Sequence, residues 1–280
     1  MPRLTAAIAL CAAVGAQTRG ESKAEPAADP VVPLLQAHAH NDYAHDPALA
    51  SALSYGCMSV EADIHLKDDA LLVAHDLEDC TPERTLEALY LLPLSRRVKE
   101  NKGRVYAGGP REFQLLIDFK SSGAPTYAAL KPLLSRYSWM LTRFSKTSRR
   151  PGAVTVVLSG AAPAKAVLAE RVRLCAIDGW FNDVEAGRTA HQVPLLSASW
   201  LTHFRWLGHG PFSEDERRKL EQMVKRAHRA GRKIRFWAVP NRRRIWDAQL
   251  DAGVDWLNID NLPAAQEFLL GRKSAEERGR

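Results

Sequence analysis

Cysteine is scarce in this chain, with four among 280 residues. One of them, Cys11, lies in an apolar run at the start that we expect to be removed by processing. The other three, Cys57, Cys80 and Cys175, are an odd number, which excludes a complete disulfide framework. We also expect Cys57 and Cys80 to lie too far apart to bridge, because one precedes a predicted strand and the other follows the segment that returns from its far end.

Long hydrophobic runs are absent after the first 16 residues, since no later stretch approaches the roughly 18 consecutive apolar residues of a membrane-spanning helix. At the start, Arg3 precedes an apolar run over residues 4–16 that has no acidic residue and is followed by polar Gln17. This layout is typical of a secretory signal peptide cleaved after Ala16. We therefore expect a secreted or periplasmic protein with a flexible leader over residues 17–30.

Long tracts of one charge are also missing. The formal net charge is +7, and removal of residues 1–16, which hold one Arg and no acid, lowers it by one to +6. This excess favours anionic partners. The clusters Arg149-Arg150 and Arg242-Arg243-Arg244 are short and lack interleaved aromatic residues, which argues against nucleic-acid binding. Residues 272–280 are predicted to form a charged tail, and the protein is expected to be monomeric.

A glycine-rich phosphate loop is missing after the first predicted strand, where the sequence reads His40-Asn41-Asp42-Tyr43. A doubly wound open sheet would ordinarily carry such a loop. Short β-type runs instead alternate with helical patterns, which predicts an α/β fold: a single-domain (β/α)8 TIM barrel over residues 31–271. The predicted strands are residues 34–40, 59–66, 113–120, 154–159, 174–180, 195–200, 233–239 and 256–260.

Two helices have clear boundaries in the sequence. One begins at Ser213, carries three acidic residues in its first turn and ends at Gly231, which is the pattern of a capped amphipathic helix. The next opens after Asn241 and ends at Gly253. Both lead into a predicted strand, as a barrel requires.

Carboxylates gather on one face of the second predicted strand. Because alternate residues of a strand share a face, Glu61 and Asp63 point one way while Val60, Ala62 and Ile64 pack under the helices. Glu61 and Asp63 are thus directed into the barrel near the carboxyl end of the strand. Two carboxylates in a poorly solvated site repel each other, and a hard divalent cation with oxygen ligands is their natural partner.

Further polar residues end the neighbouring strands. Asp118 and Lys120 share a face of the third strand, where Asp118 would complete the metal ligands and Lys120 would lie beside a phosphoryl oxygen. Residues 71–74 return His75 to the same rim. Polar residues at the carboxyl ends of three successive strands are what a barrel active site requires.

The first and last strands contribute the other candidates. His38 and His40 alternate inward on the first strand, and a pair of histidines would move protons to and from the attacking and leaving oxygens. Trp237 is expected either to form a wall for the leaving group or to lie in the core. Asp260 is expected to hold Lys120 or a histidine in place.

Three motifs carry a resemblance to a known superfamily. At His38-Ala39-His40-Asn41-Asp42-Tyr43, Ser59-Val60-Glu61-Ala62-Asp63-Ile64 and Leu72-Val73-Ala74-His75-Asp76, the chain resembles the phosphatidylinositol phospholipase C and glycerophosphodiester phosphodiesterase superfamily. It looks most like the branch that includes the fungal "altered inheritance of mitochondria" proteins. Residues 236–240 and 253–260 are similar to the last two strands of the family.

The resemblance implies a metal-assisted attack on a phosphodiester, with one histidine as general base and another as general acid. Glu61, Asp63 and Asp118 are then the ligands of one Mg²⁺ or Ca²⁺ ion, and His75 is one acid/base residue. The second acid/base residue is either His40 or His38.

His40 followed by Asn41 matches the family's His-Arg pair by position, whereas His38 with Asn41 three residues later resembles the spacing of the sphingomyelinase D branch. We favour His40. Asn41 replaces the Arg of a typical glycerophosphodiesterase, and Asp118 followed by Lys120 resembles sphingomyelinase D relatives. The resemblance therefore implies a small phosphodiester or phospholipid headgroup as substrate, with Asn41 among the substrate-binding residues and transient contact with a membrane surface.

Other functions remain open from the sequence. The nucleophile is either water or a neighbouring hydroxyl of the substrate, which would form a cyclic phosphate. A phospholipase D-like enzyme and a cyclising lyase of the sphingomyelinase D type are both alternatives. A catalytically silent barrel that binds anionic lipid headgroups is a further alternative. A metal-dependent sugar isomerase or aldolase is disfavoured, because the fourth to sixth predicted strands end in Ser159, Trp180 and Trp200 and add no metal ligands.

Overall fold

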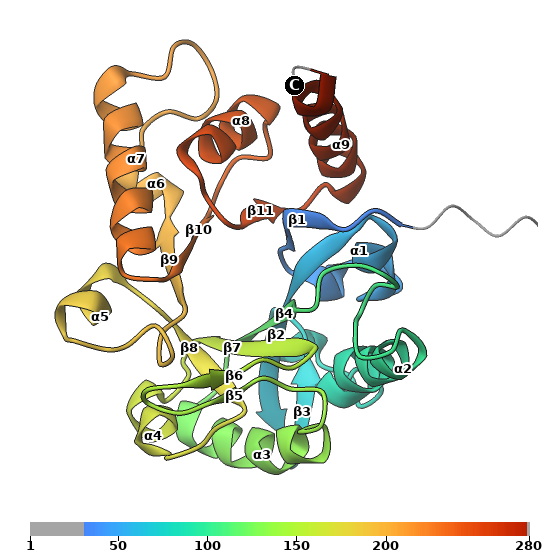
Figure 1. Cartoon of the computed structure of the whole chain (residues 1–280). Helices are drawn as coiled ribbons and strands as arrows, with labels where there is room; N and C mark the ends of the chain where they lie inside the picture. The colour runs from blue at the N-terminus through green and yellow to red at the C-terminus, as the bar shows by residue number, and fades with distance from the viewer. Residues whose placement is uncertain (1–30, 279–280) are drawn as a thin grey trace, which may run out of the picture. The chain divides into compact units, whose positions relative to one another are not determined.

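The structure is a computed structural model that describes residues 31–278. The predicted signal peptide, residues 1–16, and leader, residues 17–30, lie outside the described residues. Within the described range, the (β/α)8 barrel is confirmed, and each of the eight predicted strands is present within two residues of its predicted ends (Figure 1). The barrel strands are β1 (Leu34–Ala39), β2 (Cys57–Lys67), β4 (Phe113–Phe119), β7 (Val154–Gly160), β8 (Cys175–Gly179), β9 (Leu195–Ser199), β10 (Lys233–Trp237) and β11 (Leu257–Ile259).

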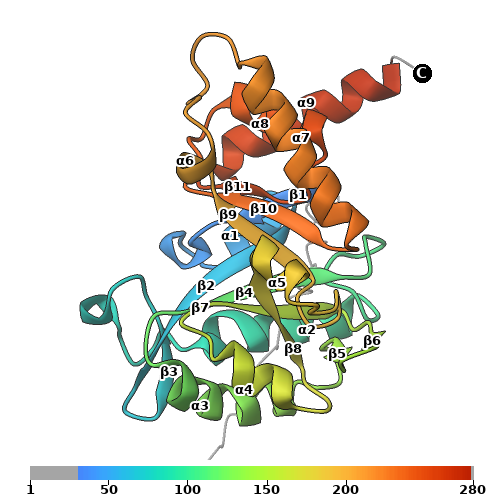
Figure 2. The same ribbon diagram turned by 90° about the vertical axis from the view of Figure 1, so that its left-hand side faces the viewer.

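The eight strands run parallel around the barrel in chain order. β11 pairs with β1, and it meets β10 only at an isolated bridge between Arg235 and Trp256 (Figure 2). The barrel is therefore nearly closed. Closure matters for function, because it brings the carboxyl ends of the first and last strands to one rim.

Helices follow the strands and cover the outside of the barrel, with α2, α3 and α4 on one side of the strands and α7, α8 and α9 on the other in Figure 1. The helices are α1 (Ala50–Ser54), α2 (Leu92–Glu100), α3 (Gly123–Arg136), α4 (Ala164–Ala169), α5 (Phe181–Glu185), α6 (Trp200–His203), α7 (Glu214–Arg229), α8 (Arg243–Ala252) and α9 (Leu262–Arg278). Three shorter helical turns are η1 (Asp42–Ala44), η2 (Leu77–Asp79) and η3 (Glu87–Leu91).

The two helix boundaries predicted from sequence are confirmed. The Ser213 hydroxyl accepts from the Glu216 backbone N–H at the start of α7, and Gly253 ends α8 in the left-handed conformation. The barrel domain was predicted to end at residue 271, but its last helix, α9, continues to Arg278. Arg272 lies 2.7 Å from Asp247 of α8, so residues predicted as a tail extend a docked helix.

Small strands outside the barrel were harder to predict. β3 (Ala70–Val73) runs antiparallel to β2 and extends it beyond the rim. β5 (Arg143–Phe144) and β6 (Arg149–Arg150) form a two-stranded hairpin. β5 and β6 have two residues each, which is too short for an alternation of polar and apolar residues to indicate a strand.

The two faces of the barrel strands differ in polarity. Val60, Ala62 and Ile64 are completely buried under the helices, as the alternation predicts. The opposite face, turned to the barrel axis, carries buried polar residues: His38, Ser59, Glu61, Asp63, Gln114, Ser197, Arg235 and Asn258. The polar interior supplies the site described below.

Two negative expectations can be checked against residues 31–278. Cys57, Cys80 and Cys175 are all free and buried. No helix in that range has the length and apolar character needed to cross a membrane.

Candidate active site

Two neighbouring strands place the predicted carboxylates at one end of the barrel. β2 and β4 pair in a register that sets Asp63 beside Asp118. Residues in register on parallel strands direct their side chains to the same face. Lys120 joins them, with Nζ 2.9 Å from Asp63 Oδ2 and 3.0 Å from Asp118 Oδ2. The ammonium group thus bridges two of the carboxylates that we expected to bind a metal ion.

Asp63 makes the most contacts of the carboxylates. Its Oδ2 also accepts from the Tyr43 hydroxyl at 2.7 Å and lies 3.1 Å from His75 Nδ1. Its Oδ1 is buried and has no hydrogen-bond partner. Burial and the neighbouring charge of Glu61 raise the pKa of Asp63, although Tyr43 and Lys120 act in the opposite direction. A buried carboxylate oxygen without a donor is costly unless an electropositive group binds it.

Glu61 is paired with an arginine that the sequence analysis did not single out. Arg235 of β10 donates from Nη1 to Glu61 Oε2 at 2.7 Å. Burial by itself would raise the pKa of Glu61, but the Arg235 charge outweighs it and holds that pKa well below its ordinary range. Glu61 is therefore ionised and its charge is balanced inside the barrel.

His38 lies beneath the cavity of the site and does not line it. Its side chain is 0 % exposed, and burial together with the Arg235 charge lowers the pKa of His38 to about 4. Its Nε2 is 2.7 Å from Arg235 Nη1, which can only donate, so the neutral ring carries its proton on Nδ1 and donates to Ser59 Oγ at 2.7 Å. Both ring nitrogens are occupied, and His38 positions Arg235.

His40 follows β1 and opens onto the cavity. Its Nδ1 lies 2.7 Å from Asp260 Oδ1, so the carboxylate accepts from Nδ1–H and Nε2 is left free to face a substrate. Of the two roles expected for Asp260, holding a histidine is the one its contacts match. Burial disfavours the charged ring, but the Asp260 hydrogen bond and the Glu61 charge outweigh burial, and the pKa of His40 is raised. A base oriented by a carboxylate in this way is a common catalytic arrangement.

His75 reaches the same rim through the antiparallel strand β3. The pairing of Val73 with Ile64 brings the residues after β3 back beside Asp63 of β2. His75 Nδ1 therefore lies 3.1 Å from Asp63 Oδ2, and the ring is 58 % exposed. Two histidines, each with a carboxylate at Nδ1, thus face one cavity.

The cavity that joins these groups has a volume of about 520 Å³, which is ordinary for a site that takes a small molecule. Asp63, His38 and Asp260 are not among the residues that line it. Trp237, for which a core position was the alternative, is 39 % exposed and lines the cavity. The lining residues are His40, Asn41, Glu61, His75, Asp118, Lys120, Ser159, Gly160, Asp178, Gly179, Trp180, Ser197, Arg235 and Trp237.

Whether the site could hold a metal ion depends on the arrangement of Glu61, Asp63 and Asp118. In the described part of the chain, no group of three or more His, Cys, Asp or Glu side chains is arranged so that it could hold a metal ion. Lys120 and Arg235 supply the positive charge next to the acidic groups. The chemistry of the donors nevertheless fits Mg²⁺ or Ca²⁺, because both ions take carboxylate oxygens and the buried Oδ1 of Asp63 has no partner.

Three functional side chains were missed in the sequence. Arg235 lies on a predicted strand at an inward position, and Tyr43 belongs to a quoted motif, but neither was assigned a role. Asp178 of β8 lines the cavity, with Oδ1 unpartnered and Oδ2 4.0 Å from Arg235 Nη2. Burial raises the pKa of Asp178 to about 7 against the Arg235 charge and the hydrogen bond with Ser197. Strand alternation alone would have placed Asp178 and Arg235 inside the barrel.

Two histidine-carboxylate pairs, a lysine and an arginine thus surround one cavity at the carboxyl ends of the strands, which is where (β/α)8 barrel enzymes hold their active sites. Residues 27–176 match the AIM6-like phosphodiesterase domain, and the chain belongs to this family. The resemblance stated from the motifs is thereby confirmed.

Relatives and a solved structure agree with this assignment. The chain is 34 % identical over 279 residues to Altered inheritance of mitochondria protein 6 of Eremothecium gossypii, covering 85 % of this chain and 70 % of that protein. It is 30 % identical over 269 residues to a homolog in Arthroderma benhamiae, covering 85 % and 84 %. A glycerophosphodiester phosphodiesterase from Parabacteroides distasonis superposes with a TM-score of 0.55 at 17 % identity, covering 86 % of this chain and 99 % of that one. This last likeness shows the barrel fold.

Proposed function

We propose that this protein is a metal-dependent hydrolase of small phosphodiesters, of the glycerophosphodiesterase or phospholipase type. The family match supports a phosphodiester hydrolase fold. The observation that carries the finer proposal is the pair of histidines, His40 on Asp260 and His75 on Asp63, which face one cavity together with Lys120. A barrel that only bound anionic headgroups would gain nothing from buried carboxylates next to the ligand.

In the proposed mechanism, His40 is the general base. Asp260 fixes its proton on Nδ1, so Nε2 accepts the proton of the attacking hydroxyl. His75, held through Nδ1 by Asp63, gives a proton to the leaving oxygen. Lys120 places positive charge beside the phosphoryl oxygens. General acid or base catalysis by one such side chain typically contributes about 10²–10⁴-fold.

Glu61, Asp63 and Asp118 are the residues that would hold the cation, and a bound Mg²⁺ or Ca²⁺ supplies charge neutralisation at a phosphoryl oxygen. Asp63 Oδ1 has no hydrogen-bond partner, so Asp63 would be able to help hold the cation without the loss of an existing hydrogen bond. Lys120 also has Asp118 Oδ2 as a partner, so its position does not depend on Asp63 alone.

The purified protein is expected to hydrolyse bis(p-nitrophenyl) phosphate or a lysophospholipid and to lose this activity in excess EDTA. Because three carboxylates are left without their cation, the loss should reach about 10²-fold or more. Added Mg²⁺ or Ca²⁺ should restore turnover, and magnesium-saturated EDTA is the control for effects of the chelator itself. Full activity in EDTA after extensive dialysis against it would contradict the metal role.

The attacking group is tested separately. A panel of glycerophosphodiesters, lysophospholipids and sphingomyelin, with products identified by phosphorus NMR, distinguishes a phosphomonoester from a cyclic phosphate. We expect a phosphomonoester, formed by attack of water. A cyclic product would assign the nucleophile to a hydroxyl of the substrate and would leave the roles of His40 and His75 unchanged.

The Asp260→Asn variant is expected to shift the pH dependence of kcat/KM. His40 must be neutral to act as a base, and its raised pKa in the wild type delays that state to higher pH. Loss of the Asp260 charge lowers the pKa of His40, so the acidic limb should move to lower pH while the plateau falls by about 10–100-fold as the ring loses its orientation. The groups that face His40 and remain in the variant are Glu61 and Arg235.

A kinetic pH profile of both proteins checks this prediction. Asp255→Asn is the matched control, because Asp255 also pairs with a histidine, His228, at 2.8 Å but lies at the other end of the barrel. An unmoved acidic limb in Asp260→Asn would remove His40 from the role of base.

A further inference from the structure

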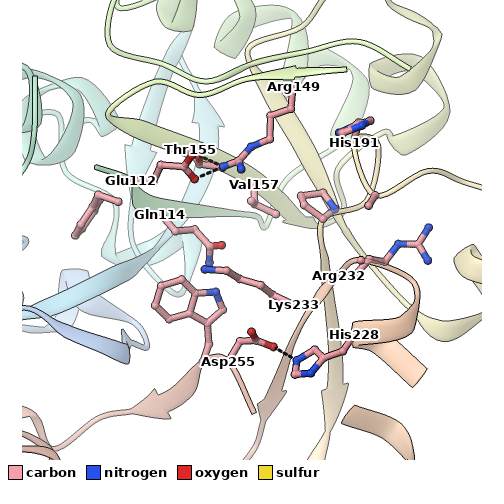
Figure 3. A pocket seen from close by; sticks show the side chains of 15 residues that line it. Glu112, Gln114, Arg149, Thr155, Val157, His191, His228, Arg232, Lys233 and Asp255 are labelled. Atoms are coloured by element: carbon pink, nitrogen blue, oxygen red, sulfur yellow. Dashed lines mark hydrogen bonds and ion pairs between the residues drawn. The ribbon is translucent and has the colours of Figure 1, made fainter. Parts of the chain in front are cut away.

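A second cavity, as large as that of the active site, lies at the opposite end of the barrel. Its volume is about 560 Å³, and it opens among the residues that begin the strands, such as Phe113 of β4 and Lys233 of β10 (Figure 3). Cavities of this size commonly take a small molecule. The lining residues are Glu112, Phe113, Gln114, Arg149, Thr155, Val157, Ala190, His191, Pro194, His228, Gly231, Arg232, Lys233, Asp255 and Trp256.

Both acidic residues of this cavity already have partners. Glu112 forms an ion pair with Arg149, which belongs to one of the arginine clusters noted in the sequence. Asp255 Oδ2 lies 2.8 Å from His228 Nε2 and accepts from the Ile234 backbone N–H at 2.9 Å. Figure 3 shows these two pairs on opposite sides of the cavity. Neither carboxylate is in ion-pair contact with Lys233 or Arg232.

Two cations of the cavity are in ion-pair contact with no carboxylate among residues 31–278. Lys233 extends between the two pairs in Figure 3, with Nζ 4.2 Å from the centre of the Trp256 ring. Arg232 is buried and donates from Nε to the Val193 carbonyl at 2.9 Å and from Nη2 to the Arg188 carbonyl, which are both neutral. The lining has three cationic residues, Arg149, Arg232 and Lys233, and two acidic residues, so it holds one positive charge in excess.

The cavity also has a buried hydrogen-bond donor without a partner, the indole N–H of Trp256. Trp256 lines the cavity and is 3 % exposed, and its indole N–H has no hydrogen-bond partner. Buried N–H groups are almost always paired with protein, water or ligand. Ion pairing that only stabilises the base of the barrel accounts for Glu112 and Asp255, but among residues 31–278 it leaves Lys233 without an ion-pair partner and the Trp256 N–H without an acceptor.

We propose that this cavity is a second binding site, specific for a small phosphate-bearing anion, with Lys233 as its main charge and the Trp256 indole N–H as a neutral donor. A phosphate group has several acceptor oxygens and a charge of the right sign, and it can meet donors from more than one direction. A cation is disfavoured by the excess positive charge of the lining. The site is separate from the active site, so the proposal stands or falls independently of the proposed reaction.

The Trp256 indole resonance provides a direct test. The full chain, labelled with ¹⁵N at its tryptophan indoles, is titrated with pyrophosphate, and Trp256→Phe assigns the resonance. We expect a saturable shift of the Trp256 signal, because a phosphate oxygen would accept from this N–H. Trp180 and Trp237 line the active site, so their resonances report any binding there in the same spectra. A Trp256 signal that does not move while Trp180 or Trp237 shifts would overturn the proposal.

Matched variants connect the shift to Lys233. Lys233→Met keeps most of the aliphatic side chain over Trp256 and should weaken the Trp256 titration about tenfold or more, whereas Lys233→Arg should retain it. Lys165→Met, on the exposed surface of α4, removes the same charge elsewhere and should have no effect. Equal affinity in wild type and Lys233→Met would refute the site. If citrate titrates Trp256 as strongly as pyrophosphate, the specificity for phosphate is refuted.

Discussion

Replacement of Asp63 by Asn should lower kcat/KM for bis(p-nitrophenyl) phosphate by about 10³-fold or more. Asp63 connects the proposed cation site with Lys120 and the proposed acid His75. Its Oδ2 contacts Lys120, Tyr43 and His75, and its Oδ1 has no hydrogen-bond partner. An amide keeps the shape of this side chain but removes its charge and one of its acceptor oxygens.

The expected loss combines two effects. The amide of the Asp63→Asn variant would present an uncharged ligand to the cation, which weakens binding of Mg²⁺ or Ca²⁺ because both ions prefer carboxylate oxygens. The substitution would also leave His75 without a charged partner at Nδ1, so the proposed acid loses its orientation. Lys120 keeps Asp118 as a partner at 3.0 Å, and the fold should therefore survive the substitution.

Steady-state kinetics and a thermal melt of the same preparation separate catalysis from folding. The matched control is Asp68→Asn, at an exposed position between β2 and β3 with a φ of 49°, a conformation that Asn adopts readily. We expect wild-type kinetics from this control. Undiminished turnover in Asp63→Asn would remove both the cation role and the His75 role of Asp63.

The strand pattern of this chain was readable because strand alternation is a local property. Val60, Ala62 and Ile64 alternate with Glu61 and Asp63, and burial of the apolar set fixes which way the acidic set points. Parallel pairing in register then brings Asp63 beside Asp118, although 54 residues of chain lie between them. Strand order and alternation were therefore enough to place the carboxylates at one rim.

The depth of each side chain along the barrel axis could not be predicted in the same way. His38 and His40 share a face of β1, so alternation could not separate them. The structure puts His38 one layer deeper, beside Ser59, whereas His40 lies at the end of the strand beside Asp260. The difference depends on the register of β1 with its neighbours, which includes an irregularity between Leu34 and His38.

Contacts across the barrel were also beyond a reading of the sequence. Glu61 and Arg235 are separated by 174 positions, and their pairing depends on closure of the barrel between the first and last strands. Alternation places Arg235 inside the barrel, but it does not indicate that Glu61, on a strand across the barrel, is its partner. The sequence analysis therefore found the carboxylates at the rim and missed the arginine beneath them.

Arg235→Met should lower the free energy of unfolding by about 3–5 kcal/mol at neutral pH, because removal of one partner leaves the other charge buried without compensation. Arg235 is buried and donates to Glu61 Oε2 at 2.7 Å, to Ser197 Oγ at 3.2 Å and to Asn258 Oδ1 at 3.2 Å. Met fills much of the same space, so the loss would come from electrostatics and not from a cavity. The matched control is Arg218→Met, on the exposed surface of α7, where loss of the pair with Asp215 should change stability by about 0.5 kcal/mol or less.

The pH dependence of urea unfolding then identifies Glu61 as the origin of the loss. In the wild type, the depressed pKa of Glu61 means that its pairing stabilises the protein above the pKa of an unfolded Glu and is lost only as pH falls through the lower folded value. In Arg235→Met, burial without the guanidinium raises that pKa, so the deficit should be largest at neutral pH and should shrink as acid protonates Glu61. Adding Glu61→Gln to Arg235→Met should regain part of the stability at pH 7, because it removes the unpaired charge. A deficit that stays constant with pH, with no recovery in the double variant, would mean that Arg235 stabilises the barrel by packing alone.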